Sequence, residues 1–238
     1  MPFLYRPHRH REPVIGAPAL ALEQVCVLHP RDKQIALDQV SFEIAPAQRV
    51  ALVGANGAGK STLLKTIVGL MRIESGKVSI YGNPIGLCYH RVAYLPQRGE
   101  IDWRFPVSLE RLVLAGRYVH LGWFGTPNAE DRAICQTVIA QLGLKALTQR
   151  QISQLSGGQQ QRALLARAIV QGADLLLLDE PFNAVDSETR EIIWNVLDQL
   201  QQQGKTVVVA THDTAQLAQQ FDRVLEMSDG KVLTLRQM

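Results

Sequence analysis

The sequence predicts an α/β fold in which a parallel sheet carries a loop that binds phosphate groups. Residues 173–178 contain four consecutive leucines, and 206–210 form a second short apolar run; both are typical of strands buried on two faces. A third apolar run, 49–53, leads directly into a glycine-rich loop and then into an amphipathic segment. A strand, a glycine-rich loop and a helix in this order indicate a nucleotide-binding α/β core.

The loop after Val53 matches the pattern G-x-x-x-x-G-K-[ST] at every fixed position. Its glycines permit the backbone angles that turn N–H groups toward phosphate oxygens at a helix N-terminus. Lys60 adds a positive charge for the β- and γ-phosphates, and the Ser61 hydroxyl is placed to bind Mg²⁺. A plain glycine-rich turn is the alternative, but the Lys-Ser pair favours a nucleoside triphosphate. The expected contacts are Gly54, Ala55, Asn56, Gly57, Ala58, Gly59, Lys60, Ser61 and Thr62.

Composition indicates an ordinary globular domain. The chain has 238 residues, of which 46% are hydrophobic, and a net charge of +3. The basic residues are dispersed except in 6–11, so the charge gives no sign of nucleic-acid binding. We expect residues 1–18 to form a disordered basic tail. Contact of residues 6–11 with acidic lipid, or weak metal binding, is the alternative.

Cysteine usage and hydropathy point to a reducing compartment and to no membrane span. Cys26, Cys88 and Cys135 are odd in number and contain no C-x-x-C, which argues against a disulfide framework and a structural zinc site. No apolar stretch approaches the roughly 18 residues that cross a bilayer, and the N-terminal residues do not resemble a signal peptide. If the protein acts at a membrane, we expect another chain to supply the spanning part.

The first third of the chain reads mainly as strands. Residues 20–28, 40–44 and 77–81 are rich in apolar residues or alternate between apolar and polar ones. We expect them to form an antiparallel flap beside the nucleotide-binding core. The segment that starts at Lys60 has one apolar stripe and ends near Gly69, as expected for an amphipathic helix.

The middle of the chain changes to a helical pattern. A short strand, 91–95, ends at Pro96-Gln97, and residues 108–151 then carry helical apolar spacing, with Asn128 as an N-cap. We interpret this part as a helical lobe inserted into the α/β core. The loop 99–106 between them carries Trp103 and Phe105, which either pack beneath the lobe or contact a partner.

The last third returns to the α/β pattern. A helix is expected from the start of Leu155–Gln159 to Val170, and another over 187–203, with Gly204 after it. Residues 224–227 and 231–235 are expected to form a hairpin around Asp229-Gly230.

Two carboxylates follow the leucine-rich strand. Asp179 and Glu180 stand at the end of a parallel strand, and such ends face the ligand crevice of the sheet. Asp179 is expected to help hold Mg²⁺, and Glu180 to accept a proton from the attacking water. The alternative is that the pair only terminates the strand.

The sequence Leu-Ser-Gly-Gly-Gln at 155–159, shortly before Leu-Leu-Asp-Glu at 177–180, resembles the signature of the ATP-binding-cassette (ABC) ATPases. The resemblance extends from about Leu20 to Leu235. It implies a P-loop NTPase core of the RecA-like type, an antiparallel β flap and an inserted α-helical subdomain. The expected domain is 19–238, with its core at 19–97 and 160–238 and the helical subdomain at about 98–159.

The resemblance also implies roles for residues outside the phosphate loop. It places Gln97 in the loop between core and lobe as a catalytic and Mg²⁺-binding residue, and it places Asp186 in a dimer-contact loop. It makes His212 a switch that touches the γ-phosphate. One position departs from the family, because His29 stands where an aromatic residue, most often Tyr, usually stacks on adenine. Imidazole stacks over less area, so either base affinity is lower or another residue covers the base.

A dimer follows from the resemblance. Ser156, Gly157, Gly158 and Gln159 lie at a helix N-terminus, which attracts anions, yet in this family they are too far from their own phosphate loop to reach its ATP. We therefore expect two copies to enclose two ATP molecules, each bound by Lys60 of one copy and Ser156 of the other.

The resemblance further implies a transport partner. The family usually docks on an integral-membrane permease, and 94–106, 116–118 and 120–123 resemble the manganese/zinc/chelated-iron import branch. We therefore expect an ATPase at the cytoplasmic face of the membrane that powers a divalent-metal importer, together with an extracytoplasmic substrate-binding protein. The alternatives are an ABC ATPase for siderophore, cobalamin, haem or another cargo, and a soluble ABC ATPase that acts on nucleic acid, ribosomes or an assembly.

Overall fold

The computed structural model describes residues 11–30, 33–87, 89–121, 125–213 and 217–238. Its centre is a six-stranded sheet with the order β10-β9-β3-β8-β7-β6, in which β9, β3, β8, β7 and β6 pair in parallel and β10 is antiparallel. The strands of this sheet are β3 (Arg49–Val53), β6 (Val92–Leu95), β7 (Leu175–Asp179), β8 (Thr206–Ala210), β9 (Arg223–Ser228) and β10 (Lys231–Gln237). The predicted parallel sheet is therefore confirmed.

The predicted antiparallel flap is a separate four-stranded sheet with the order β2-β1-β4-β5. Its strands are β1 (Leu20–Leu28), β2 (Ile35–Ile44), β4 (Ile73–Ile80) and β5 (Asn83–Pro84). The strands β2 and β4 begin earlier than predicted, at Ile35 and Ile73. Register shifts interrupt the pairing of β1 with both of them, and at such bulges the alternation of apolar and polar residues breaks down.

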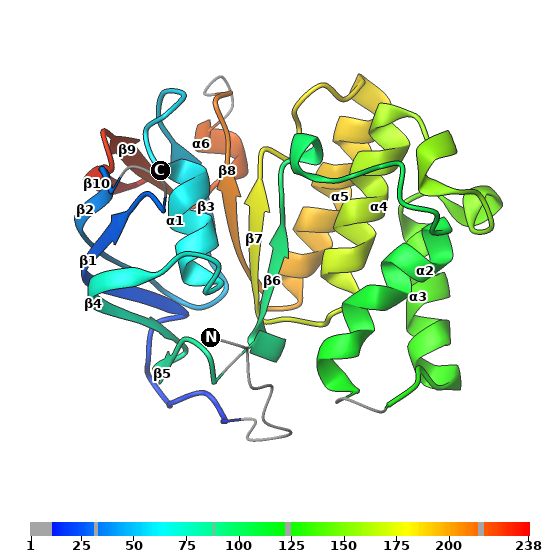
Figure 1. Cartoon of the computed structure of the whole chain (residues 1–238), viewed down its shortest axis with the longest axis horizontal. Helices are drawn as coiled ribbons and strands as arrows, with labels where there is room; N and C mark the ends of the chain where they lie inside the picture. The colour runs from blue at the N-terminus through cyan, green and yellow to red at the C-terminus, as the bar shows by residue number, and fades with distance from the viewer. Residues whose placement is uncertain (1–10, 31–32, 88, 122–124, 214–216) are drawn as a thin grey trace.

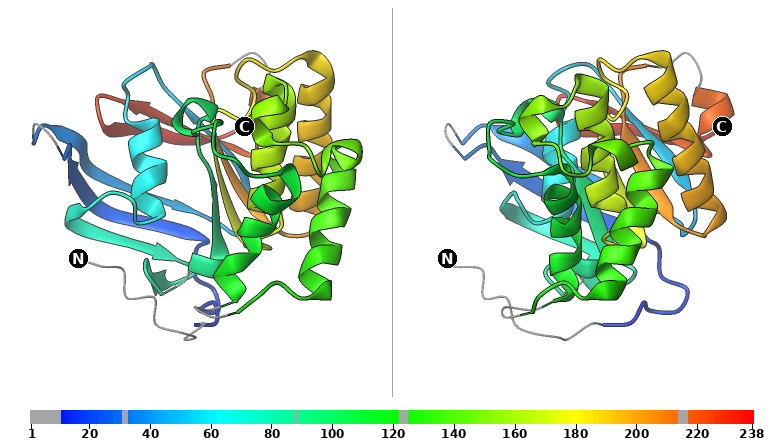
Figure 2. Two further views of the ribbon diagram at one scale, coloured as in Figure 1. Left: turned by 45° about the vertical axis from the view of Figure 1, so that its right-hand side comes forward. Right: turned by 90° about the vertical axis from the view of Figure 1, so that its right-hand side faces the viewer.

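Helices cover both faces of the central sheet. Figure 1 shows α1 (Lys60–Ile67) and the flap on one side and α2 to α5 on the other, and Figure 2 keeps the same separation in two further views. The helices of the second side are α2 (Leu109–Leu114), α3 (Ala129–Gln141), α4 (Gly157–Ile169) and α5 (Ser187–Gln202). A further short helix, α6 (Leu217–Gln220), was not predicted, because four residues are too few to show a helical period.

The leucine run in β7 explains why the sheet is buried on two faces. Leu176 and Leu178 belong to the hydrophobic core that includes the helical lobe, whereas Leu175 and Leu177 belong to the core beneath the flap. Successive side chains of a strand point to opposite faces, so one apolar run contributes to both cores. The three-layer arrangement depends on this strand.

Strand register brings several chain segments to the same edge of the sheet. Leu95 pairs with Leu178, Asp179 pairs with Ala210, and Leu52 pairs with Ala210 on the other side. The loops that follow β3, β6, β7 and β8 therefore leave the sheet at one level. Ligands of parallel α/β sheets bind at this carboxyl edge.

Hydrogen bonds at the helix ends join the helices of the helical lobe to one another. Asn128 is the N-cap of α3, as predicted, and forms a reciprocal capping box with Asp131. The Asp131 carboxylate also accepts a hydrogen bond from Arg117 Nε at 2.8 Å, which lowers the pKa of that carboxyl group. Arg117 Nη1 in turn donates to the Val170 carbonyl at the end of α4. One guanidinium thus links the start of α3 to the end of α4.

The N-terminal segment 11–18 makes specific contacts. Val14 N–H donates to the Tyr81 carbonyl at 3.0 Å, and Arg91 pairs with Glu12 at 3.0 Å. Residues 1–10 of the predicted tail, together with Cys88 and Trp123, lie outside the described residues. The boundaries proposed for the tail, the core and the helical subdomain stay predictions.

We predict that Arg117→Ala lowers the free energy of unfolding by about 3 kcal/mol, because it leaves the Asp131 carboxylate without its cation. The two side chains are only 16% and 5% exposed, so water replaces the guanidinium poorly. Urea denaturation followed by circular dichroism measures the loss. The matched control is Arg111→Ala on the exposed side of α2, which we expect to change stability by less than about 0.5 kcal/mol. Equal effects of the two substitutions would contradict the role assigned to this ion pair.

Candidate functional site

The phosphate loop connects the end of β3 to the start of α1. Gly59 is the N-cap of α1 with φ of 102°, a left-handed angle that favours glycine. Gly54 faces a different constraint, because a Cβ atom there would lie 2.4 Å from the Met227 carbonyl oxygen. The backbone therefore approaches β9 closely and then turns into a helix whose first N–H groups face outward.

Lys60 lies inside the loop that precedes it. Its side chain belongs to a residue only 6% exposed, and its ammonium donates to the carbonyls of Gly54 at 2.7 Å and Ala55 at 3.1 Å. A buried cation needs such partners. The two carbonyls hold the ammonium at the mouth of the loop, where phosphate oxygens of a bound nucleotide compete for the same donors.

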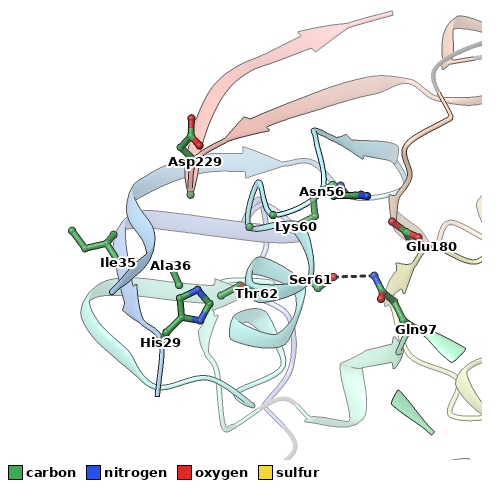
Figure 3. Close-up of a pocket in the computed structure, with 13 residues that line it drawn as sticks. His29, Ile35, Ala36, Asn56, Lys60, Ser61, Thr62, Gln97, Glu180 and Asp229 are labelled. Atoms are coloured by element: carbon green, nitrogen blue, oxygen red, sulfur yellow. Dashed lines mark hydrogen bonds between the residues drawn. The ribbon is translucent and has the colours of Figure 1, made fainter. Parts of the chain in front are cut away.

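Three polar residues from separate segments meet beside the loop. Gln97 Nε2 lies 3.2 Å from Ser61 Oγ and 3.3 Å from Asp179 Oδ1, and donates to both. Figure 3 shows the bond between Gln97 and Ser61. Asp179 is fully buried, and this burial raises the pKa of its carboxyl group. The hydrogen bonds from Ser61 and Gln97 lower the pKa, but by less than burial raises it. A cation beside Asp179 favours the ionised carboxylate.

This cluster fits Mg²⁺. Ser61, Gln97 and Asp179 offer a hydroxyl, an amide oxygen after rotation of the Gln97 amide, and a carboxylate, and Mg²⁺ prefers such oxygen ligands with the remainder supplied by water and phosphate. Within the described residues, no group of three or more His, Cys, Asp or Glu side chains could hold a metal ion by itself. Sequence analysis did not identify Tyr94, whose hydroxyl donates to the Asp179 carboxylate at 3.4 Å.

Glu180 and His212 face each other across the ends of β7 and β8. Glu180 Oε1 lies 3.7 Å from His212 Nδ1, and the Glu180 side chain is 13% exposed. The Glu180 N–H donates to the Ala210 carbonyl, which continues the pairing of the two strands by one residue. Glu180 has φ of 50°, a left-handed angle that costs a non-glycine residue about 1 kcal/mol or more. Such strain is typical of functional sites.

A groove of about 660 Å³ runs along the phosphate loop. Its lining includes Lys60, Ser61, Gln97 and Glu180, with His29 at the far end from Glu180 in Figure 3. A second pocket, of about 630 Å³, is lined by Glu180 and His212 together with 53–56 of the loop. The structure thus brings the predicted phosphate-loop residues to the carboxyl edge of the central sheet, together with Gln97, Asp179, Glu180 and His212. His29, which follows β1 of the flap, reaches the same groove.

The groove contains residues that sequence analysis did not assign to it. Ile35, Ala36, Asp229 and Gly230 line its open end near His29. The Gly230 carbonyl accepts from Asp38 N–H at 2.9 Å, and Gly230 N–H donates to the Ala58 carbonyl at 3.1 Å. The turn at 229–230 was predicted, but its place over the loop depends on these long-range bonds.

The remaining predicted residues lie elsewhere. Ser156 is the N-cap of α4 and forms a capping box with Gln159, so Gly157 and Gly158 are left with N–H groups that need partners outside the helix. Asp186 is the N-cap of α5 and lies near Gly158. None of residues 156–159 or Asp186, all of which the structure describes, lines the groove. In Figure 1, α4 lies across the sheet from α1.

The fold and the groove define a P-loop nucleotide-binding domain with a β flap and a helical lobe. A family model described as ABC transporter matches residues 37–183. The chain therefore belongs to the ABC transporter family, as its motifs predicted. Among the described residues, no helix is long and apolar enough to cross a membrane.

Individual relatives agree with this family. The zinc transport system ATP-binding protein TroB of Treponema pallidum is 47% identical over 195 residues, which cover 82% of this chain and 73% of TroB. The manganese transport system ATP-binding protein MntB of Bacillus subtilis is 43% identical over 200 residues, with coverage of 84% and 80%. A solved dimeric ATP-binding cassette, MJ0796 in a post-hydrolysis state with ADP and Pi, has a TM-score of 0.80 at 28% identity, with coverage of 92% and 98%.

We predict that His29→Ala weakens ATP binding about fivefold, because a stacked ring contributes roughly 1 kcal/mol beyond its buried area. His29→Tyr, with a larger ring, should bind ATP at least as tightly as the native chain. Isothermal titration measures both affinities. Tripolyphosphate, which has no base, serves as the control ligand and should bind all three proteins alike. If His29→Ala binds ATP with native affinity, another residue covers the base.

Proposed function

We propose that this chain is the ATP-hydrolysing subunit of an ABC importer for a divalent metal ion. The observation that carries the ATPase assignment is that Lys60 and Glu180 line one groove beside the phosphate loop, with Asp179 beneath it and His212 in the adjoining pocket that Glu180 also lines. The metal assignment is supported by the sequences of 94–106, 116–118 and 120–123 and by the names of the relatives, TroB for zinc and MntB for manganese.

The binding step uses groups that the fold already holds in place. The Lys60 ammonium exchanges the Gly54 and Ala55 carbonyls for β- and γ-phosphate oxygens. Ser61, Gln97 and Asp179 would hold Mg²⁺, which would neutralise charge on the phosphates. His29 lies against the base at the other end of the groove.

The hydrolytic step uses Glu180 and His212. Glu180 accepts the proton of the water that attacks the γ-phosphate, and His212 contacts the γ-phosphate from the end of β8. A base of this kind contributes roughly 10²- to 10⁴-fold to the rate. Gln97 donates hydrogen bonds to both Ser61 and Asp179 and belongs to the loop that enters the helical lobe. It therefore links the site of hydrolysis to that lobe.

A second copy completes each site. The backbone N–H groups of Gly157 and Gly158 stand at the start of α4 without partners inside the helix. They can donate hydrogen bonds to the γ-phosphate of an ATP molecule that another copy binds. Asp186, at the start of α5, lies near Gly158. The dimeric state of the MJ0796 relative supports this arrangement. Loss of the γ-phosphate then loosens the dimer.

A permease and an extracytoplasmic substrate-binding protein complete the importer, and this chain acts from the cytoplasmic face. The loop 99–106 supports a docking surface. Trp103 packs partly buried against the core and donates to the Arg98 carbonyl at 3.0 Å, whereas Phe105 is 64% exposed. Trp103 therefore packs against the protein core, and Phe105 is the aromatic residue that contacts the permease.

We predict that Glu180→Gln abolishes ATP hydrolysis, retains ATP binding and forms an ATP-dependent dimer, because the amide keeps the shape of the carboxylate but accepts no proton. Release of phosphate, nucleotide titration and analytical ultracentrifugation measure the three properties. Lys60→Ala is the contrasting variant; it should lose nucleotide binding and therefore the dimer as well. A Glu180→Gln variant with native turnover would remove Glu180 from the role of base.

The transport assignment predicts that cells without this chain accumulate less manganese, zinc or iron when these metals are scarce. Element analysis by mass spectrometry, in cells that carry the native chain or Glu180→Gln, measures the effect. Copurification with a multi-span membrane protein separates transport from a soluble ATPase. Normal metal content together with lost uptake of cobalamin, haem or a siderophore would instead support the second candidate cargo class.

A further inference from the structure

The turn that follows β7 is fixed at both ends. Asn183 N–H donates to the Glu180 carbonyl at 3.2 Å, which closes a four-residue turn with Pro181 in its second position. Phe182, inside the turn, is buried and stacks on Trp194 of α5 with ring centroids 4.4 Å apart. Because the proline restricts one residue and the aromatic stack anchors the next, the backbone of Asn183 has a defined place relative to Glu180.

The Asn183 side chain uses this place to contact the Glu180 carboxylate. Its Nδ2 donates to Glu180 Oε2 at 3.2 Å, while Glu180 Oε1 is the oxygen that lies 3.7 Å from His212 Nδ1. The two oxygens of the carboxylate therefore have different neighbours. A glutamate side chain has several staggered rotamers, and a donor on one oxygen favours those that keep the other toward His212.

Asn183 also lines the cavities in which hydrolysis would occur. It shares the pocket of about 630 Å³ with Glu180, His212 and residues 53–56 of the phosphate loop. It shares a neighbouring pocket of about 230 Å³ with Glu180, His212 and Arg190. The amide is thus part of the pocket lining to which Glu180 and His212 also belong.

We propose that Asn183 is a positioning residue for ATP hydrolysis. Its amide holds Oε2 of Glu180, so that Oε1 points into the cavity and takes the proton of the attacking water. The water oxygen bonds to the γ-phosphorus, the proton passes to Oε1, and the bond from the γ-phosphorus to the β-phosphate oxygen breaks. The amide itself exchanges no proton. This inference rests on the proposed function of Glu180 as the base.

We predict that Asn183→Ala lowers kcat by about 10- to 100-fold, the size of effect that loss of orientation produces. The KM for ATP should stay within about twofold, because no phosphate or base contact is lost. Asn183→Ser, which restores a short donor, should recover part of kcat. Asn183→Asp keeps the size of the side chain, but a carboxylate accepts hydrogen bonds and donates none to Oε2. Its kcat should therefore fall at least as far as that of Asn183→Ala.

The measurement is steady-state phosphate release by the full-length chain over a range of ATP concentrations. Asn195→Asp, the same substitution at an exposed site of α5, is the matched control and should leave kcat and the KM unchanged. Nucleotide titration gives the concentration of binding-competent protein and corrects kcat for it, so the test remains informative if the variants are less stable. Native kcat in Asn183→Ala, or a KM that rises in proportion to the fall in kcat, would overturn the inference. The Glu180→Gln experiment tests the base independently, so the two failures are distinguishable.

Discussion

The parallel pairing of β3, β8, β7 and β6 is the constraint on which the rest of the structure depends. The loops that carry the site residues begin where these strands leave the sheet, and the registers align the strand ends through Leu95 with Leu178 and Asp179 with Ala210. A shift by one residue would turn the leucines of β7 to the wrong cores and withdraw Asp179 from Ser61. The hydrophobic core thus fixes the register, and the register positions the carboxylates.

The phosphate loop shows how a buried charge is held until a ligand binds. Lys60 is accommodated only because two carbonyls of its own loop accept from its ammonium. Those carbonyls are in reach because glycine at position 54 lets the backbone approach Met227. A carbonyl is a weaker partner for a cation than a phosphate oxygen, so the same geometry both stabilises the empty loop and favours nucleotide binding.

The sequence predicted the elements whose signal is local and failed where long-range contacts decide. The strands β1, β3 and β8 have the predicted bounds, because short apolar runs with clear ends define them. The bulged strands β2 and β4 extend beyond their regular alternation, and α6 has no period to detect. In the site, fixed spacing along the chain predicted residues 54–62. Gln97 and His212 came from family resemblance, since no local pattern identifies them.

The contacts that sequence could not supply are those between side chains that tertiary structure brings together. Tyr94 reaches Asp179 because β6 and β7 pair in parallel. Asn183 reaches Glu180 through a turn that the stacking of Phe182 on Trp194 fixes. Such contacts matter because the left-handed backbone angle at Glu180 sets the direction in which the side chain leaves the backbone, whereas more than one rotamer of a long side chain is compatible with that direction. The strained strand end brings the carboxylate to the groove, and a neighbouring amide then selects which oxygen faces the ligand. Placement by the backbone and orientation by a side chain are therefore separate tasks in this site.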